Sequence, residues 1–203
     1  MEASSMAKSK ERIITVFGSS RPQEGHPDYE TARELGRRLA ERGFTVCSGG
    51  YGGVMEGVSR GAKESGGRVV GVTSGTFRSR TNRWVDEEIR MESWHDRLFE
   101  LIRRGDGYVA CKGGTGTLAE LAIVWEMQNK KLMRAEKPFV VLGDFWTPVL
   151  DFVRMAERER GSAWGEGGNS PVEAAETPHA AADFLAERLL GKEESKGKSA
   201  RLT

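Results

Sequence analysis

Residues 111–120 read CKGGTGTLAE and lie between an apolar run at 108–110 and a helical pattern that extends to Lys130. Glycines at a strand-to-helix junction let several backbone N–H groups converge on one point, and a helix N-terminus adds partial positive charge there. A carboxylate, Glu120, stands three residues after Thr117. The stretch therefore predicts a phosphate-binding loop with an acid beside it, which suits chemistry on a phosphorylated sugar or nucleotide.

The same stretch also has a purely structural interpretation. Thr117 could be the N-cap of the helix and Glu120 could reach back to it, as in a capping box after a tight turn. The glycine content exceeds what such a cap needs. The pattern is neither the Gly-x-Gly-x-x-Gly dinucleotide fingerprint nor a P-loop, because no Gly-Lys-Ser/Thr closes it. The sequence leaves both interpretations open.

Short apolar runs alternate with amphipathic helical stretches along the chain. The runs predict strands over 13–17, 44–47, 68–72, 108–110 and 139–142, with a short strand near Val172. The helical stretches cover 28–42, 54 to about 66, 93–104 and the segment up to 130. Two more start at the Thr-Pro pairs 147–148 and 177–178, with Thr147 as the expected N-cap of the first. Strands that are apolar on both faces predict an α/β fold, a Rossmann-like doubly wound parallel sheet with helices on both faces.

Length and composition bound the protein class. We expect a single nucleotide-binding α/β domain over 12–191, flanked by disordered polar tails at 1–11 and 192–203. A formal net charge of +1 argues against broad binding to nucleic acid or to membrane surfaces. Without an apolar stretch of ~18 residues or an apolar leader, we expect a cytoplasmic protein with no membrane partner.

Three loops follow strands that should end at one edge of the sheet, where ligands bind in such folds. The candidate phosphate- or nucleotide-binding residues in them are Gly18, Ser19, Ser20, Gly49, Gly50, Gly113, Gly114, Thr115, Gly116 and Thr117. For the glycines of 48–53, close packing of a helix on the sheet is the alternative explanation.

Arg97 stands at the edge of the apolar stripe formed by Trp94, Leu98, Leu101 and Ile102. Its side chain must reach a hydrogen-bonding partner or extend to water. Its planar guanidinium group is well suited to donate hydrogen bonds to a phosphate or a sugar.

For the other polar and reactive residues we expect mostly structural roles. We interpret His95 as a surface or supporting residue, and Cys47 and Cys111 as reduced core residues. The basic segment 78–84 is either a solvated loop, a lid over an anionic ligand or a subunit contact, and segment 73–90 as a whole has no clear assignment.

Together these motifs resemble the LONELY GUY (LOG) family, once labelled "lysine decarboxylase-like". The family pattern Pro-Gly-Gly-x-Gly-Thr-x-x-Glu is matched from Lys112 to Glu120, with lysine in place of proline. The Gly-Ser-Ser at 18–20 and the glycine-rich turn before Val54-Met55 also match. In the Met-His-x-Arg-Lys signature, His95 and Arg97 fit, but Leu98 replaces the lysine. The resemblance covers about residues 12–156.

The resemblance implies a phosphoribohydrolase; we expect no cofactor, and no metal because backbone amides and Arg97 can neutralise the phosphate. Such enzymes cleave the N-glycosidic bond of a nucleoside 5′-monophosphate, a cytokinin riboside monophosphate or an AMP-like one, to free base and ribose 5-phosphate. The family's catalytic arginine and glutamate fall on Arg97 and Glu120. Family members are usually dimeric, and the Trp-containing apolar helix at 93–104 also favours a homodimer.

The resemblance leaves other readings open. Lys112, Leu98 and Ala119 depart from the family pattern and could weaken phosphate binding or catalysis. The alternative is a non-catalytic carrier for a nucleotide or a molybdenum-cofactor-type phosphate ligand, because molybdenum-cofactor carriers are similar to this family. A DNA-processing role is disfavoured by the near-zero net charge. The decarboxylase label finds no support, because nothing marks a lysine for a Schiff base.

Overall fold

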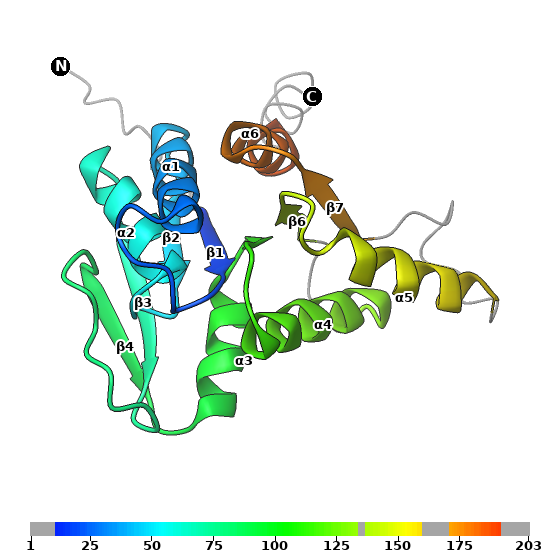
Figure 1. Cartoon of the computed structure of the whole chain (residues 1–203), viewed down its shortest axis with the longest axis horizontal. Coiled ribbons are helices and arrows are strands. Elements are labelled where there is room, and N and C mark those ends of the chain that lie inside the picture. The colour runs from blue at the N-terminus through cyan, green and yellow to red at the C-terminus, as the bar shows by residue number, and fades with distance from the viewer. Residues whose placement is uncertain (1–10, 134–136, 160–170, 192–203) are drawn as a thin grey trace, which may run out of the picture.

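The computed structural model describes residues 11–133, 137–159 and 171–191, and seven parallel strands form its single sheet. The spatial order is β4-β3-β2-β1-β5-β6-β7 (Figure 1). The strands are β1 (Ile13–Phe17), β2 (Thr45–Ser48), β3 (Val69–Ser74), β4 (Glu87–Met91), β5 (Gly107–Ala110), β6 (Phe139–Leu142) and β7 (Val172–Ala175). Four of them, β2, β3, β5 and β6, are buried along their whole length, as strands covered on both faces must be.

Three helices cover each face of the sheet (Figure 1). One layer holds α1 (Pro27–Glu41), α2 (Val54–Glu64) and α6 (Pro178–Leu189), and the other holds α3 (Trp94–Arg104), α4 (Thr115–Asn129) and α5 (Thr147–Glu159). Each layer closes its own apolar core against the sheet. The predicted Rossmann-like, doubly wound α/β fold is confirmed.

The strand order reverses beside β1. From β1 the chain moves outward to β4, then returns to place β5 on the other side of β1. The loops after β1 and β5 therefore separate at the carboxyl edge of the sheet, and the first turn of α4 follows β5 directly. Such a switch point is where doubly wound folds leave room for a ligand.

The unassigned segment 73–90 contains an edge strand. β4 pairs with β3 only, and its residues alternate between partly buried and exposed positions. This short strand contains no apolar run, because three of its residues are the polar Glu87, Glu88 and Arg90. It was therefore not predicted as a strand. The strand predicted over 68–72 also ends too early, because the buried residues Thr73 and Ser74 continue β3.

The capping-box interpretation of the glycine-rich loop is wrong. Helix α4 begins at Thr115 with Gly114 as N-cap, and no side chain caps it. Thr117 lies inside the first turn and is buried, because its side chain packs against Gly113. Helix α5 likewise includes Thr147 as its first residue, so the cap lies one residue earlier than expected. Thr177 caps α6, accepting from the N–H of Ala180, at the helix start that the sequence predicted.

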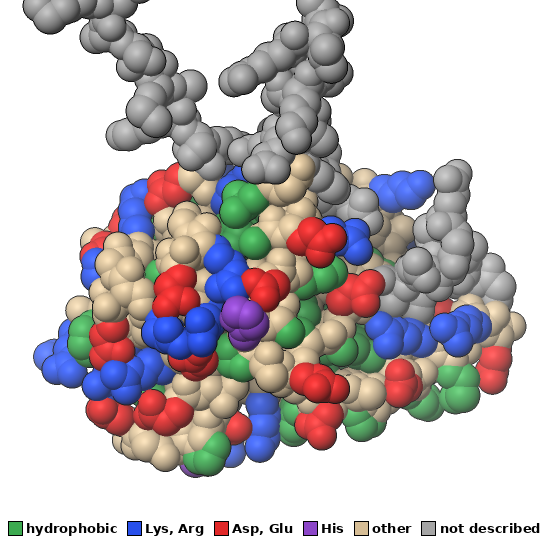
Figure 2. Space-filling model, turned by 90° about the horizontal axis from the view of Figure 1, so that it is seen from above, with side chains coloured by type: hydrophobic (Ala, Val, Ile, Leu, Met, Phe, Trp, Pro, Cys, Tyr) green, Lys and Arg blue, Asp and Glu red, His purple; other side chains and the backbone are tan. Residues whose placement is uncertain are grey.

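Charged side chains of both signs are interspersed over the face seen in Figure 2. On α1, for example, Glu34 accepts from both Arg37 and Arg38 at 2.6 and 2.7 Å. This mixing agrees with the near-zero net charge. None of the helices in the described ranges is long and apolar enough to cross a membrane. Both proposed disordered tails lie outside the described residues, apart from Glu11 at the edge of the first.

Candidate functional site

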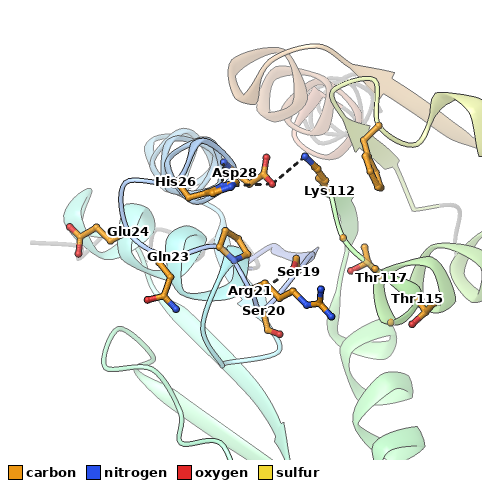
Figure 3. A pocket seen from close by; sticks show the side chains of 15 residues that line it. Ser19, Ser20, Arg21, Gln23, Glu24, His26, Asp28, Lys112, Thr115 and Thr117 are labelled. Carbon is orange, nitrogen blue, oxygen red and sulfur yellow. Dashed lines mark hydrogen bonds and ion pairs between the residues drawn. The ribbon is translucent and has the colours of Figure 1, made fainter.

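A cleft of about 890 Å³ opens at the switch point (Figure 3). The β1–α1 loop forms one wall with residues from Ser19 to Asp28, and the β5–α4 loop forms the other with Lys112 to Thr117. Phe145, from the β6–α5 loop, completes the second wall. Of the predicted binding residues, the cleft thus brings together Ser19, Ser20, Gly113, Gly114, Thr115, Gly116 and Thr117.

Short backbone contacts fix the base of the cleft. The N–H of Ser19 donates to the carbonyl of Lys112 at 3.2 Å, and the Ser19 carbonyl accepts from the N–H of Val54 at 2.8 Å. Gly18 does not line the cleft. A Cβ on it would lie 2.4 Å from the Val54 side chain, so glycine is needed there for helix packing. The predicted role of Gly18 in ligand binding is therefore replaced by a structural one.

Gly114 and Gly116 face open space. A Cβ at either position would meet no atom within 4 Å, and neither residue has a positive φ. Neither packing nor backbone strain therefore requires glycine at these two positions. Their effect is to expose the first-turn N–H groups of α4, a helix whose N-terminus no side chain caps. This arrangement leaves room for an anion to approach the backbone closely and is the kind of site that helix N-termini offer to phosphates.

Arg97 does not line this cleft and is buried, with 7% of its surface exposed. Its Nε donates to the carbonyl of Val72 at 2.8 Å. The guanidinium carbon lies 5.4 Å from the ring centre of Tyr51 and 5.9 Å from that of Phe77. Desolvation lowers the pKa of Arg97, and the nearby Glu120 carboxylate opposes that shift. The arginine is thus a rigidly held cation that acts on Glu120.

Gly49 makes room for Arg97, Gly50 holds a turn beside β3, and neither glycine lines the cleft. A Cβ on Gly49 would lie 1.8 Å from Nη2 of Arg97 and 2.5 Å from Sδ of Met55, so the guanidinium occupies the space a side chain would need. Gly50 has a φ of +73° and its carbonyl accepts from the N–H of Asn82 at 2.8 Å. We expected these glycines to bind ligand, and the structure instead uses them to seat the arginine and to anchor the next loop.

Glu120 lies one helical turn after Gly116 and Thr117, on the same face of α4. It is only partly exposed, and burial raises the pKa of its carboxyl to about 7, while Arg97 acts to lower it. A carboxyl group with a pKa near 7 is suited to exchange protons, and in its ionised form it can stabilise positive charge. Arg97 and Glu120 thus influence each other electrostatically, although neither is among the residues that line the cleft.

The raised pKa of Glu120 predicts a pH dependence of stability. The carboxyl ionises near 4.5 in the unfolded chain and near 7 in the folded one, so the folded state holds the extra proton between these values. This group's contribution to stability is complete below about pH 4.5 and is lost as the pH rises through 7. Urea unfolding should show the native chain losing about 2 kcal/mol relative to Glu120→Gln between pH 5 and pH 8. A difference that does not change with pH would contradict the burial of this carboxyl.

The cleft also contains residues that the sequence did not mark as binding residues, among them Asp28, Phe145 and Arg21. The Lys112 ammonium lies 3.6 Å from the Asp28 carboxylate and 5.7 Å from the ring centre of Phe145. Arg21 also lines the cleft. The one sequence signal for Arg21 is its position directly after Ser20, in a loop that was already predicted to bind ligand.

The remaining candidates lie outside the cleft. His95 is exposed, as expected. Both cysteines are free and buried, and burial raises each thiol pKa to about 12, which agrees with inert core residues. In the basic segment, Trp84 lies between the guanidinium groups of Arg60 and Arg83. Among the described residues, no group of three His, Cys, Asp or Glu side chains could hold a metal ion.

Fold and site together define a doubly wound, Rossmann-like α/β protein with its cleft at the topological switch point. The model of the SLOG cluster4 family matches residues 11–152. The chain belongs to this family, and so to the LOG proteins that its motifs resemble.

Two curated relatives illustrate the family. The cytokinin riboside 5′-monophosphate phosphoribohydrolase LOG of Oryza sativa subsp. japonica is 34% identical over 155 residues, which cover 75% of this chain and 64% of the rice protein. A protein of Archaeoglobus fulgidus, described as uncharacterized, is 32% identical over 130 residues, or 64% of this chain and 83% of the relative. The match to the rice enzyme thus spans less than two thirds of its length.

Solved structures with the same fold include molybdenum-cofactor proteins. The molybdenum cofactor binding protein from Rippkaea orientalis has a TM-score of 0.70 and 26% identity, covering 89% of this chain and 98% of its own. The molybdenum cofactor carrier protein from Chlamydomonas reinhardtii has a TM-score of 0.65 and 25% identity, covering 89% and 99%. Both an enzyme and a carrier function therefore occur among similar proteins.

Proposed function

We propose that this protein hydrolyses the N-glycosidic bond of a nucleoside 5′-monophosphate, releasing free base and ribose 5-phosphate. The observation that carries the proposal is the coupling of Glu120 to the buried Arg97, one turn behind an uncapped, glycine-exposed helix N-terminus. An anion site alone would fit any phosphate ligand. A carboxyl balanced near neutrality behind it adds a group that can take part in chemistry.

The phosphate would bind to the backbone N–H groups of Thr115, Gly116 and Thr117. The open space beside Gly114 and Gly116 admits phosphate oxygens to the backbone, and the helix dipole favours their negative charge. The ribose would then lie toward Glu120. Ser19 and Ser20, on the opposite wall of the cleft, are placed to bind ligand hydroxyls.

Glycosidic cleavage builds positive charge on the anomeric carbon of the ribose. The ionised Glu120 would stabilise that charge and orient or deprotonate the attacking water. The bond between the anomeric carbon and the base nitrogen breaks with its electron pair on nitrogen, which gains a proton. The water oxygen bonds to the same carbon and gives up a proton. Arg97 would favour the ionised form of Glu120.

Incubation of the purified protein with AMP and with N6-substituted AMP, followed by chromatography, tests the proposal. We expect free base and ribose 5-phosphate in equal amounts, and none from the unphosphorylated nucleoside under the same conditions. Binding of these nucleotides without any release of base would overturn the hydrolase proposal. That result would favour the alternative, a carrier of phosphate-bearing ligands, which the molybdenum-cofactor neighbours support.

We also propose a homodimer formed through the α3–α4 layer. Helix α4 carries apolar residues around its whole circumference, although one side faces solvent in the single chain. Leu118 on this helix and Trp94 and Phe99 on α3 are 37%, 42% and 51% exposed. A helix that is apolar all round is normally buried on all sides, and a second copy would bury this one.

Light scattering should give about 45 kDa, twice the 22.4 kDa chain. Phe99→Glu combined with Leu118→Glu should give a monomer, because two charges would be placed in the buried interface. Leu190→Glu, at a residue equally exposed but at the end of α6 in the other layer, should stay dimeric. A monomeric unmodified chain would contradict this proposal.

A further inference from the structure

Two side-chain cations line the cleft, and only one of them is available to a ligand. Lys112 is held between Asp28 and the Phe145 ring. Glu24, a second carboxylate of the cleft wall, pairs with Arg60. Within the part of the chain that the structure describes, the Arg21 guanidinium meets no carboxylate and makes no hydrogen bond. Arg21 is therefore the unneutralised cation of this cleft.

The backbone that carries Arg21 is fixed. Its N–H donates to Oγ of Ser19 at 3.1 Å, and Ser19 in turn is tied to both Lys112 and Val54. Pro22, which follows, is buried and has a restricted φ. From this anchor the side chain extends into the cleft toward the loop that carries Thr115 and Thr117 (Figure 3).

The two positions that correspond to the arginine and lysine of the family signature supply no free cation to this cleft. Leu98, which stands where the family signature has a lysine, is buried in the apolar core with 2% of its surface exposed. Arg97 donates to the Val72 carbonyl and lies against two aromatic rings. Neither residue can supply a free positive charge on the wall opposite α4.

We propose that Arg21 binds the phosphate of the ligand from the β1–α1 side, opposite the N-terminal turn of α4. The planar guanidinium donates two parallel hydrogen bonds to phosphate oxygens, and these are among the strong charge-assisted kind. Arg21 thereby selects phosphorylated ligands over the corresponding nucleoside or free sugar. This inference rests on the phosphate site of the proposed function and does not depend on hydrolysis.

Calorimetric titration with ribose 5-phosphate and with AMP tests the inference. Arg21→Gln should weaken both by about tenfold or more, because it removes a hydrogen-bonding charge. Arg21→Lys should recover only part of the loss, since a lysine cannot donate in parallel. Arg188→Gln removes the same charge at the end of α6 and should leave both affinities unchanged. Melting temperatures should match throughout, because Arg21 is exposed.

The outcomes separate this inference from the hydrolase proposal. If Arg21→Gln binds ribose 5-phosphate within twofold of the unmodified chain, the role of Arg21 is wrong, even if base is released. If Arg21→Gln loses affinity while the unmodified chain releases no base, Arg21 keeps its role and hydrolysis is rejected. If the unmodified chain does not bind ribose 5-phosphate at millimolar concentrations, the phosphate site itself is rejected, and the role of Arg21 with it.

Discussion

Replacing Glu120 with glutamine is expected to lower the turnover number for base release by about 10²–10⁴-fold. Glutamine keeps the shape of the side chain but can neither carry the negative charge that meets the anomeric carbon nor accept a proton from water. Phosphate binding depends on the backbone of residues 115–117 and should be retained. Steady-state assays with AMP, together with calorimetric titration of the same variant, measure the two quantities separately.

A matched control is available on the same helix. Glu126→Gln removes the same charge from an exposed position of α4, two turns beyond the site, and should leave turnover unchanged. If Glu120→Gln keeps full activity on nucleoside monophosphates, Glu120 is not the catalytic carboxylate. If Glu120→Gln loses its affinity for ribose 5-phosphate as strongly as its turnover, Glu120 is a binding residue only.

The second large effect is expected from Gly49→Ala. The added methyl group would lie 1.8 Å from Nη2 of Arg97, so the guanidinium has to move away from its present position. A displacement of about 1 Å at a reacting group can cost on the order of 100-fold in rate. The atoms that must move, Nη2 of Arg97 and Sδ of Met55, belong to side chains and not to the backbone, so the fold itself should tolerate the change.

Gly36→Ala provides the contrast that isolates this effect. Its Cβ would lie 2.0 Å from the backbone carbonyl oxygen of Val58, which cannot move without shifting α2. We therefore expect Gly36→Ala to lower the free energy of unfolding by about 1–3 kcal/mol or more. Gly49→Ala should instead lose activity at nearly unchanged stability. Equal activity of Gly49→Ala and the unmodified chain would show that the position of Arg97 does not matter for the reaction.

The parallel sheet and the alternation of strands and helices could be predicted, because the buried strands appear in the sequence as short runs of apolar residues. Residues 139–142, for example, are apolar on both faces, as only a doubly covered strand requires. The edge strand β4 has no such apolar run, because its residues alternately face solvent and include Glu87, Glu88 and Arg90. Its place depends on pairing with β3, a long-range contact that no local pattern contains.

The site was only partly predictable for a similar reason. The glycines at 114 and 116 can be found locally, since they follow a strand and open a helix. The roles of Gly49 and Gly50 could not be separated from ligand binding, because what they accommodate is the Arg97 side chain and a loop more than 30 residues further on. Tyr51 and Phe77, which surround Arg97, were missed because aromatic residues in loops carry no local sign of such contacts.

A crystal structure of the Glu120→Gln variant soaked with AMP tests the central claim most directly. The account predicts the phosphate on the backbone N–H groups of residues 115–117, with the Arg21 guanidinium on its other side and the anomeric carbon beside the side chain of residue 120. A nucleotide bound elsewhere on the molecule, or bound in this cleft with its ribose pointing away from residue 120, would contradict it.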